Sequence, residues 1–126
     1  MDYDYENKYA GYKLRDRILY ITFKKSLNIT YDVARKLVQD RLRFQSFSNF
    51  DVICDISDVK SIHSEARTYL STYGSNLLAN VALVSTNATV YTMALFYIRI
   101  NNPKAPTKLF KSISEAIDYI KSIKKL

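Results

Sequence analysis

Four residues near the middle of the chain could support catalysis: Cys54, Asp55, His63 and Ser64. A cysteine close to a histidine can act as a nucleophile, and a serine with a histidine and an aspartate can form a hydrolytic triad. However, Cys54 lies inside an apolar run, where a buried thiol is usually inert. His63 and Ser64 are adjacent at an expected helix start, so their side chains point apart. We therefore expect no enzymatic activity and no catalytic residue.

Metal and cofactor sites also lack the residues that they need. His63 is the only histidine and Cys54 the only cysteine, so no cluster has the spacing of metal ligands. The two glycines, Gly11 and Gly74, lie far apart and cannot form a glycine-rich phosphate loop. The sequence therefore predicts no metal site and no cofactor.

Periodic apolar patterns around these residues predict alternating strands and helices. Residues 9–24 contain two short strands joined too closely for a crossover, so they must be antiparallel. A helix is expected from Asn28 or Thr30 to about Gln45. Residues 52–56 then form an almost continuous apolar strand, which is typical of a strand covered on both faces.

The second half of the chain repeats the pattern of a strand followed by a helix. The full order is ββαβαβαβα, which predicts an α/β fold with a mostly parallel sheet and an antiparallel first strand. Residues 1–8 lack apolar periodicity, so we expect a mobile N-terminal tail. One domain is expected over residues 9–126.

Two strings after the apolar strand are similar to those of a known family. Residues 55–59 read DISDV and residues 62–66 read IHSEA. With the element order, they resemble the STAS domain, the fold of anti-sigma-factor antagonists, which is also grouped with SEC14-like sequences in bacterial proteins of uncertain role. KLF at residues 108–110 and SEAI at residues 114–117 resemble the end of the SEC14-like subgroup. The resemblance covers residues 9–125 and implies a STAS-like fold.

The resemblance also implies a place for regulation. In antagonists of this family the second string carries Asp, then Ser, then Ser or Thr, then Gly, and a partner kinase phosphorylates the second hydroxyl residue. That position is Glu65 here, which cannot be phosphorylated, although it resembles a fixed charge of about one instead of nearly two. His63 and Ala66 replace the Asp and the Gly. Ser64 matches and is a candidate phosphorylation site at a shifted position; alternatively, Ser64 and Glu65 only cap the helix.

We therefore expect a non-catalytic, regulatory domain that binds a protein partner. Its binding surface would be the loop and helix start after the apolar strand, because ligand sites in α/β sheets lie at the carboxyl ends of strands. The candidate partner-binding residues are Asp55, Asp58, His63, Ser64, Glu65 and Arg67.

A second hypothesis concerns the helix that begins at Asn87 or Thr89, which is apolar on most of its circumference. Apolar surface that the sheet leaves uncovered would form a homodimer face, a partner groove or a pocket for a small apolar ligand or lipid. A fully buried helix would show the same pattern. The candidate residues are Met93, Leu95, Phe96, Tyr97 and Ile100.

The formal net charge of +7 suggests a third hypothesis, a basic module for nucleic acid or an anionic membrane surface. The bases concentrate in the last quarter of the chain and at Arg35, Lys36, Arg41 and Arg43. No nucleic-acid-binding signature is present, so we do not expect nucleic acid as the partner. No apolar run reaches the roughly 20 residues of a membrane span, and the start lacks a signal-peptide pattern, so we expect a cytoplasmic protein without a transmembrane segment.

Overall fold

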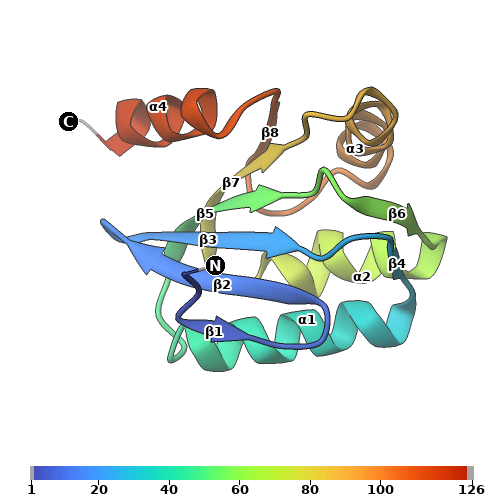
Figure 1. Ribbon diagram of the computed structural model, residues 1–126, viewed down its shortest axis with the longest axis horizontal. Coiled ribbons are helices and arrows are strands. Elements are labelled where there is room, and N and C mark those ends of the chain that lie inside the picture. The colour runs from blue at the N-terminus through green and yellow to red at the C-terminus, as the bar shows by residue number, and fades with distance from the viewer. Residues whose placement is uncertain (1, 125–126) are drawn as a thin grey trace.

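The computed structural model in Figure 1 describes residues 2–124. The strands are β1 (Tyr5–Glu6), β2 (Ala10–Arg15), β3 (Ile18–Phe23), β4 (Leu27–Ile29), β5 (Phe50–Asp55), β6 (Val59–Ile62), β7 (Leu78–Val84) and β8 (Thr107–Phe110). The helices are α1 (Tyr31–Phe44), α2 (Ser64–Thr72), α3 (Ala88–Asn101) and α4 (Ile113–Lys124), and a 3-10 turn, η1 (Tyr73–Ser75), follows α2. The expected ends of the resemblance and of the domain, at residues 125 and 126, lie outside the described residues.

The main sheet has six strands in the order β1-β2-β3-β5-β7-β8. β2 pairs with β3 in antiparallel register, and β3, β5, β7 and β8 pair in parallel. The two residues that join β2 to β3, Asp16 and Arg17, both have positive φ angles, 54° and 64°. This backbone matches the twist of a two-residue hairpin turn. The predicted α/β fold, mostly parallel with an antiparallel first strand, is confirmed.

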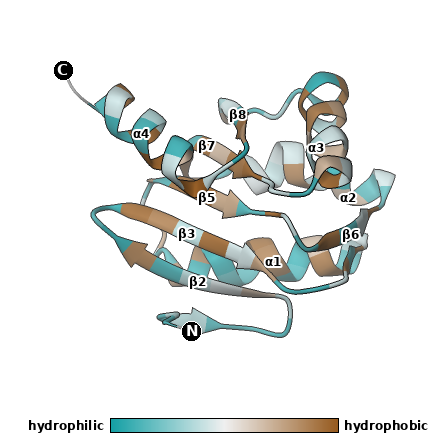
Figure 2. Ribbon diagram, turned by 45° about the horizontal axis from the view of Figure 1, so that its top comes forward, coloured by the Kyte–Doolittle hydropathy of each residue, from teal (hydrophilic) through white to brown (hydrophobic). Residues whose placement is uncertain are grey.

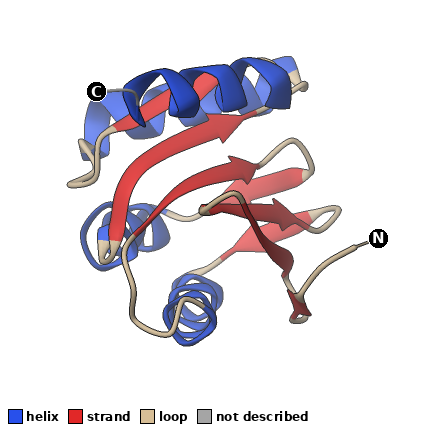
Figure 3. Cartoon of the chain, turned by 90° about the vertical axis from the view of Figure 1, so that its left-hand side faces the viewer, coloured by secondary structure: helices blue, strands red, loops and turns tan. Residues whose placement is uncertain are grey.

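Each central strand is apolar on both faces because helices cover the sheet on both sides (Figures 1 and 2). On one face, Ile53 and Ala82 pack against Ala116 and Ile120 of α4. On the other face, the side chains of β5 and β7 pack toward α1 and α2, which lie across the sheet from α4 (Figure 3). Successive side chains in a strand point to opposite faces, so one strand contributes to both layers.

The predicted helix starts agree with the structure at α1 and α3. Thr30 caps α1 by accepting a hydrogen bond from the Val33 amide at 3.3 Å. Asn87 caps α3 by accepting from the Thr89 and Val90 amides at 2.9 and 3.2 Å. In both cases the side-chain oxygen satisfies a backbone donor that has no partner inside the helix.

Three short strands were not predicted. β4 and β6 form a parallel pair beside the main sheet, with Ile29 opposite Ile62. β6 lies in the segment 57–62, which was expected to be a loop. Strands of three or four residues are too short to show a periodic pattern, so no sequence signal predicts this pair.

The third short strand, β1, lies within residues 1–8, which were expected to be a tail. It pairs with β2, and Asp4 accepts hydrogen bonds from the Leu14 amide at 2.8 Å and from Arg15 at 2.9 Å. Asn7 donates to the carboxylate of Asp40 on α1 at 2.9 Å. This segment therefore makes specific contacts with the domain, while its mobility stays a prediction.

Asp40 is the buried anchor of this segment. Its side chain is 3% exposed and also accepts from the Tyr5 hydroxyl at 3.2 Å and pairs with Lys36 at 3.0 Å. Burial alone would raise the pKa of Asp40, but the bonds from Asn7 and Lys36 outweigh it, and the net shift is downward. The folded state therefore favours the charged carboxylate.

We predict that Asp40→Asn lowers the free energy of unfolding at pH 7 by about 1–3 kcal/mol, because Tyr5, Asn7 and Lys36 lose a charged acceptor that is itself buried. The folded pKa is depressed, so this contribution is present above the unfolded value of about 3.9 and is lost as the pH falls through the folded value. Urea denaturation at pH 7 and pH 3 measures the difference, which should shrink at pH 3. Gln39→Ala, at an exposed position on the same helix, is the control; an unchanged difference at pH 3 would contradict the prediction.

Candidate functional site

The loop after β5 is fixed to the loop after β7. Asp55 accepts a hydrogen bond from the Ser57 amide at 3.0 Å, which closes a tight turn. The Ser57 hydroxyl in turn accepts from the Thr86 amide at 3.0 Å. Asp55, predicted to contact a partner, therefore shapes this loop.

The other acidic and polar residues predicted at this surface are exposed, on either side of β6. His63 occupies the N-cap position of α2 but makes no side-chain cap, and its amide donates to the Ile29 carbonyl at 2.9 Å. Ser64 and Glu65 are the first helical residues, so the predicted capping role of Ser64 is not observed. The structure therefore brings His63, Ser64 and Glu65 together at the start of α2, whereas Asp58 lies at the other end of β6.

Arg67, predicted to offer a charge to the partner, makes contacts within the domain. Its Nη1 donates to the Ile62 carbonyl at 3.1 Å, and its guanidinium lies over the Phe96 ring at 5.4 Å from the centroid. A cation over an aromatic face is attracted by the ring's negative face. Arg67 therefore joins the start of α2 to the outer side of α3.

The apolar residues of α3 divide between two surfaces. Met93 and Tyr97 line a cavity, whereas Phe96 and Ile100 are 49% and 64% exposed. Leu95 is half-buried and does not line the cavity. The sequence left two hypotheses open for this helix, a pocket and an exposed apolar face. Met93 and Tyr97 belong to the pocket, and Phe96 and Ile100 belong to the exposed face.

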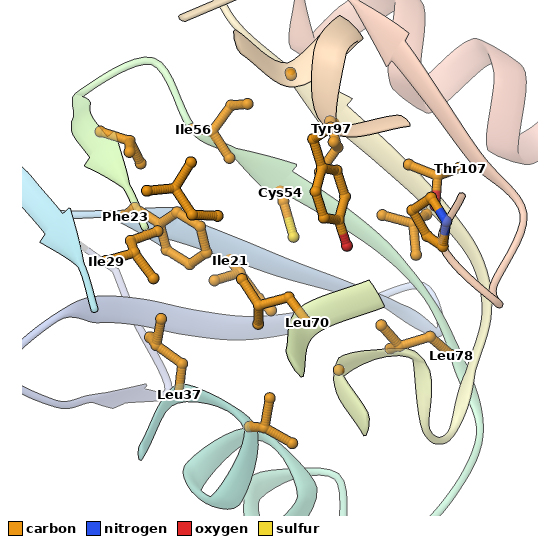
Figure 4. Close-up of a pocket in the computed structure, with 18 of the residues that line it drawn as sticks. Ile21, Phe23, Ile29, Leu37, Cys54, Ile56, Leu70, Leu78, Tyr97 and Thr107 are labelled. Carbon is orange, nitrogen blue, oxygen red and sulfur yellow. The ribbon is translucent and has the colours of Figure 1, made fainter. Parts of the chain in front are cut away.

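The cavity has a volume of about 140 Å³ and lies between one face of the sheet and the helices α1, α2 and α3 (Figure 4). β5 and β7 contribute the side chains that point away from α4, because strand side chains alternate. Nearly all of the lining is apolar. The strand residues that line it include Ile21, Phe23, Ile29, Cys54, Val59, Ile62, Val81 and Leu83, the loop after β5 adds Ile56, and the helix residues include Leu37, Val38, Leu70, Val90, Met93, Ala94 and Tyr97.

A few polar groups interrupt this apolar lining. The Cys54 thiol faces the cavity, and the Tyr97 ring reaches into it from α3 with its hydroxyl directed inward (Figure 4). Burial raises the pKa of Cys54 to about 12, and burial also raises the pKa of Tyr97. Both groups are therefore neutral at pH 7, and Cys54 lacks the thiolate character of a nucleophile.

Arg41 also lines the cavity, and sequence reasoning missed it. Its charge placed it with the basic residues Arg35, Lys36 and Arg43, but its side chain is only 4% exposed. The signal was its spacing, because Arg41 lies three residues after Val38 on the stripe that faces the sheet.

The chain matches the model of a family described as "Domain of unknown function (DUF7793)" over residues 12–124. The chain belongs to this family. No curated protein matches the DUF7793 chain. Its fold is similar to the crystal structure of an uncharacterized protein from the DUF3478 family with a SpoIIAA-like fold, from Shewanella loihica PV-4. The TM-score is 0.59 at 13% identity, over 91% of this chain and 97% of that chain.

This similarity confirms the STAS-like fold that the sequence predicted, and at this identity it shows the fold alone. Within residues 2–124, no helix is long and apolar enough to cross a bilayer. The same residues contain no group of three histidine, cysteine or acidic side chains that could hold a metal ion.

We predict that the native Cys54 thiol reacts with a disulfide reagent at pH 8 at least about 100-fold more slowly than the unfolded chain, because burial suppresses the thiolate. Cys54 is the only cysteine, so the absorbance change reports this thiol alone. Traces recorded with and without urea measure the two rates. Similar rates would show that the cavity wall is open to solvent.

Proposed function

We propose that this DUF7793 domain binds a small apolar ligand in the cavity and catalyses no reaction on it. The observation that supports the proposal is the cavity itself, of about 140 Å³ with an apolar lining. An engineered protein cavity of about 150 Å³ with a similar lining binds benzene. The space therefore suits a ring-sized or short branched apolar group.

The energy of an empty cavity supports the same conclusion. Protein interiors are close-packed, and a void lowers stability by about 24 cal/mol per Å³. An enclosed, dry cavity of about 140 Å³ would therefore cost about 3 kcal/mol, and this cavity, which opens partly to solvent, costs less. A ligand that fills it recovers much of this free energy.

The lining supports binding without catalysis. In the described part of the chain it contains no histidine, aspartate, glutamate or lysine. The phenols and the thiol that line it have raised pKa values, so no lining group titrates near pH 7 to move a proton. The cavity can hold a molecule but offers no general acid or base.

We predict that benzene stabilises the protein, by about 1.4 kcal/mol at ten times its dissociation constant, because it binds the folded state alone. Ala94→Leu places a larger side chain in the cavity and should abolish this stabilisation without unfolding the protein. Thermal unfolding with and without benzene measures both effects. Ala88→Leu, at an exposed position of α3, is the matched control and should keep the response; a response that survives Ala94→Leu would place benzene elsewhere.

A second candidate function is protein binding through the exposed surface at the start of α2. His63, Ser64 and Glu65 are exposed there, and Arg67 connects this segment to the exposed ring of Phe96. An exposed aromatic side chain beside charged groups is a common arrangement in protein interfaces. The resemblance to anti-sigma-factor antagonists, which act by binding proteins, supports a regulatory role, with Ser64 as the site of a modification. A second copy of the chain is one candidate partner.

We predict that Ser64→Ala combined with Glu65→Lys abolishes capture of the partner, because it removes a hydroxyl and reverses a charge at the centre of this surface. Affinity capture from the source cells, followed by mass spectrometry, identifies the retained proteins, and light scattering detects a homodimer. Asp118→Lys reverses an exposed charge on α4 and should leave capture unchanged. Undiminished capture by the double variant would exclude this surface.

A further inference from the structure

Arg41 is a buried cation that lines the cavity. Its guanidinium donates to the Gln45 side-chain oxygen, to the Asn76 carbonyl at 3.1 Å and to the Gly74 carbonyl at 3.0 Å. The bonds to the two carbonyls hold the turn η1 against α1, but all three acceptors are neutral. Among residues 2–124, no carboxylate forms a salt bridge with Arg41. Its positive charge therefore lacks a protein counter-charge.

The two acidic groups that influence the pKa of Arg41, Cys54 and Tyr12, do not supply one either. Burial raises the pKa of Cys54 to about 12, and burial raises that of Tyr12 as well. Both are protonated and neutral at pH 7, whereas an arginine stays charged. A buried charge without a counter-charge is rare because its desolvation is costly, so the cavity favours an anion.

Tyr97 adds a hydrogen-bond donor to the same space. Its hydroxyl is directed into the cavity (Figure 4), and no protein acceptor for it is present among the described residues. Tyr97 and Arg41 both line this cavity. A phenol donor and a guanidinium in the wall of one small cavity are a suitable pair for a carboxylate.

The number of charges limits the class of anion. Arg41 is the only charged residue in the described lining, so one negative charge is balanced and two are not. The apolar remainder of the cavity takes a group of about six carbons, as a cavity of similar volume does for benzene. We propose that the ligand of this cavity is a small apolar carboxylic acid in its ionised form, with its carboxylate bound by Arg41 and Tyr97. This inference rests on the proposed function and names its ligand class.

Three probes of similar shape test the inference on the unmodified chain. They are cyclohexanecarboxylate, its uncharged amide, and benzene, each titrated by calorimetry at pH 7.5. We expect the carboxylate to bind at least about tenfold more tightly than the amide, since one charge-assisted contact commonly has that effect. If the amide binds as tightly as the carboxylate, the inference is wrong while the proposed function stands. If none of the three binds, the proposed function fails, and the inference with it.

Single substitutions test which residues cause the preference for the carboxylate over the amide. Arg41→Met should remove the preference for the carboxylate, and Tyr97→Phe should reduce it several-fold, whereas Arg43→Met, at an exposed position on the same helix, should preserve it. Ala94→Leu should abolish binding of all three probes; carboxylate binding that persists in Ala94→Leu would occur on the basic surface and would overturn the inference. Arg41 also holds η1, so circular dichroism checks that its variant is folded. If it is not, Tyr97→Phe and the carboxylate–amide comparison decide.

Discussion

Parallel pairing of β5 with both β3 and β7 is the constraint on which the rest of the structure depends. A parallel strand cannot be reached by a tight turn, so each pairing requires a crossover, and the crossovers place helices on the faces of the sheet. β5 must therefore be apolar on both sides. Its Ile53 packs under α4, and its Cys54 faces the cavity on the other side.

The two faces are covered to different degrees. α4 alone covers one face, and its small residue Ala116 lets the helix lie close to the sheet. On the other face three helices meet above the strands, and α3 contacts β8 at the edge of the sheet. Three helices with separate axes do not fill the volume between them, and the cavity is the space that remains.

The sequence was sufficient for the order of the main elements because period-two and period-3.6 patterns are local. It was insufficient for β4 and β6, whose pairing joins two short segments about 30 residues apart. It was also insufficient for Arg41. The position of this residue on the α1 stripe indicates burial, but its charge argues against burial, and only the carbonyls of Gly74 and Asn76, distant in sequence, resolve the conflict.

The resemblance to STAS domains predicts a binding surface at the loop after β5. The cavity lies behind this loop, and Ile56 of the loop lines it. The STAS-like strings lie within residues 55–66. They do not determine how far apart α1, α2 and α3 lie, so they do not predict the cavity. α3 connects the two places, since Met93 faces the cavity while Phe96 lies on the outside next to Arg67. The candidate site is therefore better described by which side of α3 a residue occupies than by its place in a motif.

The order of the main sheet, β1-β2-β3-β5-β7-β8, is also the order of the strands in the chain. As the polypeptide leaves the ribosome, each parallel strand finds its neighbour already synthesised, and the sheet can grow in one direction without waiting for a distant segment. The sheet face formed by Ile18, Ile53 and Ala82 differs from the strand pairings. The helix that packs on it, α4, follows all of the strands in the chain. A nascent chain that pauses before α4 therefore presents an uncovered apolar sheet face, and such a surface is prone to aggregation.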